Sequence, residues 1–454
     1  MTFIEQLKSI VPSEQYSDHA DSLEVVSKDE STIEKVIPIA VVWAKNSKEI
    51  IEIVKLCYDN KIPITTRGSG SALEGSTIPD KNGIVLDLSQ MTDIIEYWQD
   101  DLQVKVQPGL IYDNLNEKIK RDGLFFPPSP GGSGDVASIG GMVSTNASGI
   151  YSVKYGGTKD YILELEIVTG RGEFIKLGNR AIKRSSGYNL VDLICSSEGT
   201  LGVITSITMK LSGLPEDRFQ TAFKFTNEIE AAQAVSEIRK YGIDVAALEF
   251  LDKRVMQALN QLKDYELEEV PCLFLEFHGP RPTIDSNLES VKLICEELNG
   301  QELKLADGLN PWEVRHFVTD AIKHLKPGYT IIRNDVAFPI SHLPEMVELC
   351  YKLGDENNIL IHTFGHVGMG LLHALLLADK SNQKEWGTAI RINDEIIKRT
   401  IELNGTISGE HGIGIGHKNL IENEHGLSVE YMKKIKKQFD PANILNPGKI
   451  FDIY

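Results

Sequence analysis

The sequence predicts an α+β protein built from two domains, and three observations lead to that prediction. The chain has 454 residues, a length that at roughly 100 to 200 residues per domain corresponds to two or more domains. Strand-like and helix-like apolar patterns alternate along it. A cluster of turn-forming residues, SGLPEDR at 212–218, interrupts the alternation. We therefore expect a polar leader at 1–34, a first domain at 35–213 and a second domain at 214–454.

The expected first domain mixes helices and short strands. Its first helix covers Asn46–Asp59, where apolar residues recur at helical spacing behind an Asn/Ser cap. A strand at Ile62–Thr66 follows and runs into glycine. The remaining predicted elements are strands at Gly83–Leu88, Leu102–Val106, Ile162–Thr169 and Gly202–Leu211 and a helix at Tyr112–Asp122.

The expected second domain restarts the alternation after the turn cluster. Its predicted elements are strands at Thr221–Phe225, Ala246–Leu251 and Cys272–His278 and a helix at Glu228–Tyr241, with another helix after the third strand. This order is typical of helices packed on one face of an antiparallel sheet.

The charge of the chain excludes one class of partner. Lys and Arg number 47 against 65 Asp and Glu, which gives a formal charge of −18. Nucleic-acid binding needs a basic surface, so we do not expect it. Acidic and basic residues are scattered through every segment, and the excess acid therefore describes a solvated exterior.

Cysteine usage and hydropathy indicate a reducing compartment. The five cysteines are odd in number, lie far apart and form no C-x-x-C, so we predict buried free thiols. The N-terminus lacks a signal-peptide pattern, and no stretch is apolar enough to span a membrane. We expect a cytoplasmic protein and leave open peripheral attachment to a membrane through a partner.

Glycine is concentrated in four loops of the first domain: RGSGSALEG at 67–75, PGGSG at 130–134, SIGGMVSTNASG at 138–149 and EGTLGVI at 198–204. Backbone without Cβ can approach a phosphate and direct N–H groups at it, although turns alone would explain any single loop. Leu73 stands where the Rossmann fingerprint needs its third glycine, and neither a P-loop nor G-x-S-x-G occurs. The remaining interpretation is that these separate loops together hold a large cofactor with a pyrophosphate group.

Histidines and a carboxylate recur among glycines in the last quarter of the chain. His366 and His373 are seven residues apart, and Glu410 and His411 stand between later glycines. Two histidines and a carboxylate are a familiar set of divalent-metal ligands. In a straight strand residues seven apart face opposite sides, so the two histidines converge only if the glycines bend the backbone or the segment is helical. A glycine-rich turn packed with neutral histidines is the alternative.

Two arginines are candidates for binding a carboxylate. Arg315 and Thr319 lie four apart on a predicted helix face, and Arg333 lies in a strand that enters DVAFP. A guanidinium presents a planar fork that suits a carboxylate. The alternative interpretation is that Arg315 lies on a solvent-exposed helix face and binds no substrate.

Three runs, PITTRGSGSALEGSTIP, PSPGGSGDVASIGGMVSTNASGIYSVKYGGTKDYILELEIVTGRGE and GYNLVDLICSSEGTLGVIT, carry a family resemblance. They resemble the FAD domain of the vanillyl-alcohol-oxidase/p-cresol-methylhydroxylase (PCMH) superfamily. Within it, the chain is similar from about Ile33 to Lys449 to the branch of D-lactate dehydrogenase, the glycolate oxidase large subunit and D-2-hydroxyglutarate dehydrogenase. The resemblance implies an FAD-linked oxidase of two domains, a PCMH-type FAD-binding domain and a C-terminal substrate domain of antiparallel sheet plus helices.

The resemblance also implies which residues contact FAD. The first glycine loop would wrap the pyrophosphate, with Arg67 adding positive potential, and the later loops would line the flavin and the adenosine. The implied residues are Arg67, Gly68, Ser69, Gly70, Ser71, Ala72, Leu73, Pro130, Gly131, Gly132, Ser138, Ile139, Gly140, Gly141, Thr145, Asn146, Ser148, Gly149, Glu198, Gly199, Gly202, Val203, Ile204 and Asn446. The first loop has no histidine, so we expect FAD that is bound non-covalently.

The family's pattern G-H-x-G-D-G-N-x-H followed by G-E-H-G-I-G assigns roles to the histidines. It implies that His366, His373 and Glu410 bind a divalent metal, Zn or Mn, and that His411 is the catalytic base. By the same resemblance Arg315, Thr319 and Arg333 match the clamp for the substrate carboxylate.

The chain departs from that pattern at two positions. Met369 and Leu371 stand where relatives have Asp and Asn. Those losses remove polar groups that could orient ligands or touch substrate, so substrate range and metal affinity do not transfer directly.

The implied reaction oxidises a small D-2-hydroxy acid, of the D-lactate, glycolate or D-2-hydroxyglutarate class, to the 2-oxo acid by hydride transfer to flavin N5. Electrons would pass to an electron-transfer flavoprotein, a quinone or an iron–sulfur subunit, and a homodimer is compatible with the resemblance. Four alternatives stay open: direct use of oxygen, a flavin-dependent transferase of the alkylglycerone-phosphate synthase kind, a non-catalytic flavoprotein and a hydrolytic zinc site. The chain lacks the His-rich run of the transferase.

Overall fold

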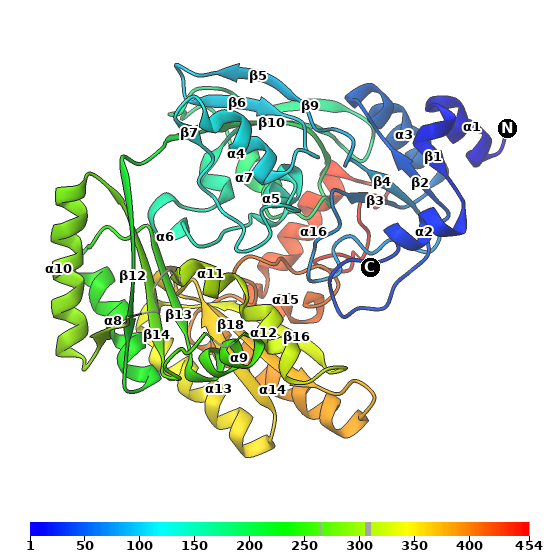
Figure 1. The fold of residues 1–454 in the computed structure, drawn as a ribbon. Helices are drawn as coiled ribbons and strands as arrows, with labels where there is room; N and C mark the ends of the chain where they lie inside the picture. The colour runs from blue at the N-terminus through cyan, green and yellow to red at the C-terminus, as the bar shows by residue number, and fades with distance from the viewer. Residues whose placement is uncertain (264, 305–309, 454) are drawn as a thin grey trace. The chain divides into compact units, whose positions relative to one another are not determined.

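The fold comes from a computed structural model, which describes residues 1–263, 265–304 and 310–453. The chain forms two compact units that do not follow the chain in simple order (Figure 1). Unit 1 contains residues 1–148, 157–214 and 410–454, and unit 2 contains residues 149–156 and 215–409. The main chain therefore leaves unit 1 near the predicted turn cluster and returns to it at Glu410.

Unit 1 begins with a small sheet flanked by helices. Strands β2, β4 and β3 are parallel, and β1 pairs antiparallel with β2. Helix α3 starts where the sequence predicts because the Asn46 side chain accepts a hydrogen bond from the N–H of Glu49. Its apolar side packs into the core beside this sheet. The elements are α1 (Phe3–Ile10), β1 (Tyr16–Ser17), α2 (Ala20–Val26), β2 (Ala40–Trp43), α3 (Ser47–Asn60), β3 (Ile64–Arg67) and β4 (Ile84–Asp87).

A five-stranded antiparallel sheet, ordered β5-β6-β10-β8-β9, forms the rest of the unit 1 framework. The predicted strands at 102–106, 162–169 and 202–211 correspond to β6, β8 and β10. The elements are β5 (Ile94–Trp98), β6 (Gln103–Val106), α4 (Tyr112–Lys120), β7 (Leu124–Phe125), α5 (Ile139–Thr145), β8 (Ile162–Val168), β9 (Phe174–Gly178), α7 (Leu190–Ile194), β10 (Val203–Lys210) and β11 (Ser212–Gly213).

Both ends of the chain belong to unit 1, which differs from the predicted division. The expected leader forms α1, β1 and α2, and its Leu7 and Val11 enter the core. At the other end, the N–H of Ile64 donates to the carbonyl of Ile444 at 2.7 Å, so the chain end extends the β3 edge. The C-terminal helices are α15 (Ile421–His425) and α16 (Ser428–Phe439). The compact unit 2 ends at Gly409, whereas the predicted second domain runs on to residue 454, because contacts between distant segments attach the C-terminal residues to unit 1.

Unit 2 is built on a seven-stranded sheet, ordered β15-β12-β14-β13-β17-β18-β16, whose described pairings are all antiparallel. The strands are β12 (Asp217–Lys224), β13 (Ala247–Leu251), β14 (Cys272–Gly279), β15 (Gln301–Glu302), β16 (Thr330–Ala337), β17 (Leu360–Gly365) and β18 (Leu371–Ala378). The strands predicted at 221–225, 246–251 and 272–278 correspond to β12, β13 and β14.

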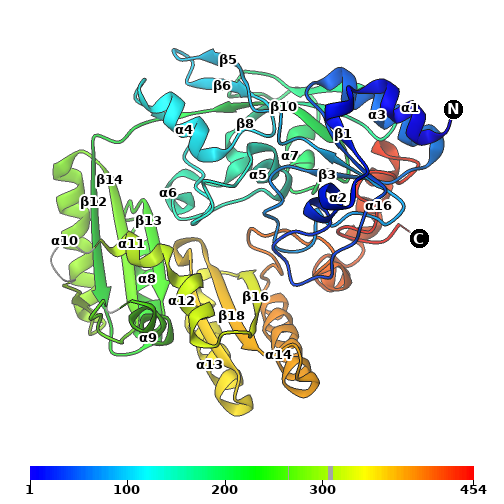
Figure 2. The same cartoon turned by 45° about the vertical axis from the view of Figure 1, so that its right-hand side comes forward.

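Helices cover both faces of this sheet, whereas the sequence order favoured one face (Figure 2). On one face α9 (Lys253–Leu262), α11 (Pro311–His316) and α12 (Val318–Leu325) pack against Leu251 and Phe274. On the other, α14 (Gln383–Glu402) meets β16, where Asn334 Nδ2 donates to Asn393 Oδ1 at 3.0 Å. Both faces are apolar, so both need cover. The unit also contains α6 (Ser152–Tyr155), α8 (Glu228–Lys240), α10 (Arg281–Glu297) and α13 (Leu343–Asn357).

Two sequence predictions concern the chain as a whole. All five cysteines are buried and free, which confirms that they form no disulfide. Among the described residues, the helices are too short or too polar to cross a membrane.

Candidate active site

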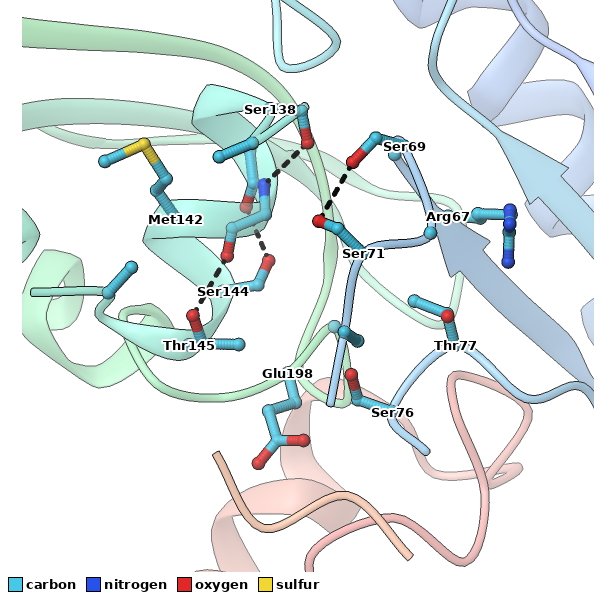
Figure 3. A pocket seen from close by; sticks show the side chains of 18 of the residues that line it. Arg67, Ser69, Ser71, Ser76, Thr77, Ser138, Met142, Ser144, Thr145 and Glu198 are labelled. Carbon is cyan, nitrogen blue, oxygen red and sulfur yellow. Dashed lines mark hydrogen bonds between the residues drawn. The ribbon is translucent and has the colours of Figure 1, made fainter. Parts of the chain in front are cut away.

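A hollow lies within unit 1, where the glycine-rich loops meet. Figure 3 shows Ser69 and Ser71 of the first loop facing Ser138, Ser144 and Thr145 on or beside α5. The lining residues are Thr66–Leu73, Ser76, Thr77, Leu88, Pro108, Pro130, Gly131, Ser133, Ala137, Ser138, Gly140–Met142, Ser144, Thr145, Ala147, Ser148, Glu198, Gly199, Gly202, Ile204, Glu410, His411 and Asn446. Hydroxyl groups and bare backbone thus dominate the walls.

Close packing of the loops requires glycine at particular positions. A Cβ on Gly68 would collide with Ser138 Oγ, and a Cβ on Gly140 would lie 2.6 Å from the Pro108 Cβ. Ser138 caps α5 by accepting a hydrogen bond from the N–H of Gly141 at 3.3 Å. The loops therefore approach without side chains between them and leave a cradle that a long, narrow anion can fill.

Arg67 lines the hollow, as predicted, and its guanidinium also holds the first loop in place. Its Nη1 donates to the carbonyl of Lys28 at 2.8 Å, and Figure 3 shows the side chain directed away from the serines of the hollow. Burial lowers the pKa of Arg67, and Asp87, Asp29 and Glu30 oppose that shift. The guanidinium thus connects the first loop to residues after α2, and its role beside a pyrophosphate stays a prediction.

Most of the other predicted FAD contacts line the hollow, and five do not. Ile139 and Val203 have no solvent exposure, because their side chains pack in the hydrophobic core. Asn146 ends α5 with φ of 53°, and its Oδ1 accepts from the N–H of Lys159 at 2.9 Å. Gly149 belongs to unit 2, and Gly132 is not among the lining residues.

Several lining residues were missed by the sequence reasoning. Ser76 and Thr77 directly follow the first glycine loop, and Ser144 stands inside the third, so a polar residue adjoining a predicted loop was the available signal. Leu88 and Pro108 come from separate strand ends, and no local pattern indicates them.

Glu198 and Asn446 close one end of the hollow. The Glu198 carboxylate accepts hydrogen bonds from the N–H groups of Ile413 at 2.7 Å and Gly414 at 2.9 Å, and burial raises its pKa to about 7. Asn446 Nδ2 donates to the Glu198 carbonyl at 2.6 Å. Among the described residues, the buried Asn446 Oδ1 has no hydrogen-bond partner. It is an acceptor suited to a hydroxyl or amino group of a ligand.

Glu410 and His411 border the same hollow from the C-terminal part of unit 1. Ser148 Oγ donates to Glu410 Oε2 at 2.8 Å. His411 Nδ1 lies 3.9 Å from Glu74 Oε1, and His417 Nε2 lies 3.2 Å from Glu74 Oε2. The predicted base and one predicted metal ligand therefore belong to the unit that carries the predicted FAD loops.

The other two predicted metal ligands lie together in unit 2. His366 directly follows β17, a tight turn at Val367–Met369 comes next, and β18 returns with His373. The centroids of the two imidazole rings are 5.5 Å apart and the rings are nearly perpendicular. Gly370 makes the turn possible, with φ of 77° and a Cβ position that the carbonyl of Phe338 occupies. The glycine-containing turn between β17 and β18 reverses the chain and brings the two histidines together.

Carboxylates accompany both histidines. Glu249 Oε1 lies 2.6 Å from His366 Nδ1, and Asp335 Oδ1 lies 3.5 Å from His373 Nδ1. Asp335 pairs with His373 across β16 and β18, two residues after Arg333 on the same strand face. The sequence reasoning missed both acids. A lone acid in an otherwise apolar strand was the signal for Glu249.

The predicted carboxylate clamp is arranged differently from the expected helix face. Arg315 lies in α11 and Thr319 in α12, because the helix breaks at Phe317. Arg315 Nε donates to Glu249 Oε2 at 2.9 Å, so that acid offsets part of its charge. Arg333 is partly buried in β16.

The departures from the family pattern differ in exposure. Met369 is 43% exposed in the turn, whereas Leu371 is 3% exposed in β18. Leu371 packs in the interior, so only Met369 offers its side chain to solvent.

Comparisons with known proteins agree with this architecture. A model described as "FAD binding domain" matches residues 38–178, and one described as "FAD linked oxidases, C-terminal domain" matches residues 214–450. The chain is 34% identical to the mitochondrial D-lactate dehydrogenase [cytochrome] of Arabidopsis thaliana, over 98% of this chain and 79% of that protein. It is 35% identical to glycolate oxidase subunit GlcD of Bacillus subtilis, over 98% of this chain and 96% of that protein.

A solved structure shares the fold. p-Cresol methylhydroxylase with substrate bound matches with a TM-score of 0.83 at 15% identity, over 99% of this chain and 96% of that one. With matches to both domain models and to full-length relatives, the chain belongs to the family of FAD-linked oxidases, which are oxidoreductases with a PCMH-type FAD-binding domain.

Proposed function

We propose that the protein is an FAD-dependent dehydrogenase that oxidises a small D-2-hydroxy acid to the 2-oxo acid. One observation carries the proposal: Glu410 and His411 border the hollow whose other walls are the glycine-rich loops expected to hold FAD. A proton-accepting imidazole beside a flavin site is what oxidation of an alcohol carbon requires. The names of the D-lactate dehydrogenase and glycolate oxidase relatives support the hydroxy-acid class.

The unit 1 hollow has features that fit FAD. Glycine positions such as Gly68 and Gly140 leave a cradle that Cβ atoms would fill, and hydroxyls of Ser69, Ser71 and Ser138 line it. The buried Asn446 Oδ1 is an acceptor for a donor of the ligand. When bound, FAD supplies the flavin N5 that accepts a hydride. Among the described residues that line the hollow, the histidine is His411, which is the proposed base and does not belong to the first glycine loop. We therefore keep the expectation that FAD is bound non-covalently.

A divalent metal fits the chemistry of the predicted donor set. His366 and His373 offer imidazole nitrogens, and Glu410 offers a carboxylate, a combination that suits Zn or Mn. The close approach of the two imidazoles within unit 2, with Asp335 beside His373, supports a cation there. The metal would lower the pKa of the substrate hydroxyl.

The remaining roles fall to side chains of this chain. His411 takes the proton of the substrate hydroxyl, and the Glu74 carboxylate, 3.9 Å from its Nδ1, favours the imidazolium that forms. Arg333, Arg315 and Thr319 bind the substrate carboxylate, with the plane of the Arg315 guanidinium held by Glu249. Electrons then pass to a separate acceptor, an electron-transfer flavoprotein, a quinone or an iron–sulfur subunit.

A substrate screen tests the proposal. Purified protein loaded with FAD is mixed without oxygen with D-lactate, glycolate or D-2-hydroxyglutarate in separate samples, and the visible flavin absorbance is followed. We expect at least one acid to bleach the flavin and yield its 2-oxo acid. Retention of full flavin colour with all three acids would contradict the proposal.

A further inference from the structure

We propose that Glu249 is a positioning residue for the hydroxy-acid site, holding a metal-binding imidazole and a carboxylate-binding guanidinium with its two oxygens. The inference rests on the proposed function, because it takes His366 as a metal ligand and Arg315 as part of the clamp. The inference gives a role to Glu249, a buried acid that takes no part in the proposed reaction steps.

The geometry within unit 2 joins the three side chains through one carboxylate. Glu249 lies in β13 and has no solvent exposure. Its Oε1 is 2.6 Å from His366 Nδ1, and its Oε2 accepts from Arg315 Nε at 2.9 Å. Each oxygen thus serves a different partner, and movement of either partner would disturb the other.

The bond to His366 fixes the tautomer of that imidazole. An ionised carboxylate only accepts hydrogen bonds, so the Nδ1 of His366 must carry the proton. That tautomer carries a lone pair on Nε2, the form in which an imidazole binds a metal, and the ring cannot rotate without losing the bond to Glu249. A carboxylate behind a ligating histidine orients the ring and raises its basicity.

The bond to Arg315 fixes the plane of the guanidinium. Nε is held by Glu249, and the guanidinium carbon lies 4.8 Å from the centroid of the Phe364 ring. A substrate carboxylate would therefore meet the Nη1–Nη2 edge in a defined orientation, which suits two parallel hydrogen bonds.

A purely structural role explains this arrangement less well. Two buried charges and an imidazole cost desolvation free energy, and apolar side chains of similar volume are often at least as stable. The strand around Glu249, ALEFL, is otherwise apolar and fully buried. Charged groups in such a place are expected where orientation matters.

The same sheet provides a matched control. In β14 the buried Glu276 pairs with His278, with Oε1 2.6 Å from Nε2, and also accepts from Gln220 Nε2 at 2.9 Å. Ala247 of β13 is the register partner of Glu276, so both acids point to the same face of the sheet. Among the described residues, Glu276 makes hydrogen bonds to His278, Gln220 and Tyr151, and none of these is a predicted metal ligand or part of the clamp. Glu276→Gln therefore repeats the loss of a buried Glu–His pair without touching the proposed site.

The test measures Zn²⁺ affinity by competition with a chromophoric chelator, on FAD-loaded protein without substrate. Glu249→Gln should weaken Zn²⁺ binding by about 10-fold to 100-fold, the usual cost of losing a partner behind a metal ligand. Glu276→Gln should leave the Zn²⁺ Kd within about twofold, and thermal unfolding of both variants reports the structural cost. In a His366→Ala background, Glu249→Gln should change the Kd no further.

Two additional variants, a double variant and His366→Ala, separate a loss of folding from a loss of metal binding. If Glu249→Gln does not fold, the double variant Glu249→Gln/Arg315→Met removes the unpaired buried charge and should still lose Zn²⁺ affinity. Equal Kd values for wild type and the Glu249 variants, with His366→Ala losing the metal, would overturn this inference alone. Wild-type protein that binds no Zn²⁺ at His366 would overturn it together with the metal part of the proposed function.

Discussion

The two units build their parts of the proposed site from different materials. The unit 1 hollow is walled by glycine backbone and hydroxyl groups, and its one lining arginine side chain turns away to hold a loop. Unit 2 presents ionisable side chains from its strands, the turn after β17 and helix α11, with Glu249, His366, His373, Asp335 and Arg315 linked by successive contacts. A large cofactor can be recognised by shape and many weak donors. A small acid offers few atoms, so its recognition needs full charges in fixed positions.

The largest effect is expected where proton transfer is lost. His411→Ala should slow flavin reduction by about 10²-fold to 10⁴-fold, the range of general-base catalysis, while FAD stays bound. Stopped-flow reduction under anaerobic conditions measures the rate, and flavin absorbance measures the cofactor. Unchanged reduction kinetics would remove His411 as the base and leave the chemistry of unit 1 without a proton acceptor.

Metal removal tests the charged part of unit 2. Dialysis against a chelator should reduce activity strongly, and addition of Zn²⁺ or Mn²⁺ should restore it, because two imidazoles and a carboxylate bind such cations. FAD content should not change. Activity that is indifferent to the chelator, in protein shown by elemental analysis to be metal-free, would contradict a metal site.

Glu198 should make the stability of the protein depend on pH. Its folded-state pKa of about 7 exceeds the ordinary value of 4.5, so the folded protein binds more protons between these values. The free energy of unfolding should therefore fall as the pH rises from about 4.5 to 7, by at most about 3 kcal/mol from this group. Urea unfolding at several pH values measures it. In the Glu198→Gln variant the free energy of unfolding should depend less on pH in that interval. An identical pH dependence in the variant would contradict the raised pKa of Glu198.

A single glycine tests the shape of the unit 1 hollow. Gly68→Ala should weaken FAD binding by about 10-fold or more, since the new Cβ would collide with Ser138 Oγ and push two loops apart. The control is Gly213→Ala, whose Cβ would meet no atom within 4 Å. Fluorescence titration of the apoprotein with FAD gives both affinities. Equal affinities in the two variants would show that the loops do not need this close approach.

The smallest effect is expected at the substrate carboxylate. Arg333→Ala should raise the KM for a small 2-hydroxy acid by about 10-fold to 100-fold, the cost of one hydrogen bond to a charged group. The flavin reduction rate at saturating substrate should change less. Steady-state kinetics with an artificial electron acceptor separates KM from kcat. An unchanged KM would move the carboxylate clamp away from β16.

Local patterns account for much of what the sequence predicts correctly. The Asn46 cap and the apolar spacing behind it locate α3, and the apolar run before the glycine at 68 locates β3. The glycine loops locate the hollow, because a shortage of side chains is visible in sequence. Such features depend on residues close together in the chain.

The sequence says less where distant residues decide the outcome. The Arg67 guanidinium binds the carbonyl of Lys28, a contact that no local pattern indicates. The chain end joins unit 1 because Ile444 pairs beside Ile64, and His366 meets His373 through a hairpin whose turn depends on the close approach of Gly370 to Phe338. None of these contacts leaves a periodic pattern.

The central claim is that hydride leaves C2 of a hydroxy acid for flavin N5. The most direct measurement compares anaerobic single-turnover reduction by the bleaching acid with protium or deuterium at C2. The account predicts that flavin reduction is several-fold slower with deuterium, because that C–H bond breaks in the step that bleaches the flavin. Reduction at the same rate with both isotopes, under conditions where substrate binding is faster than bleaching, would contradict it.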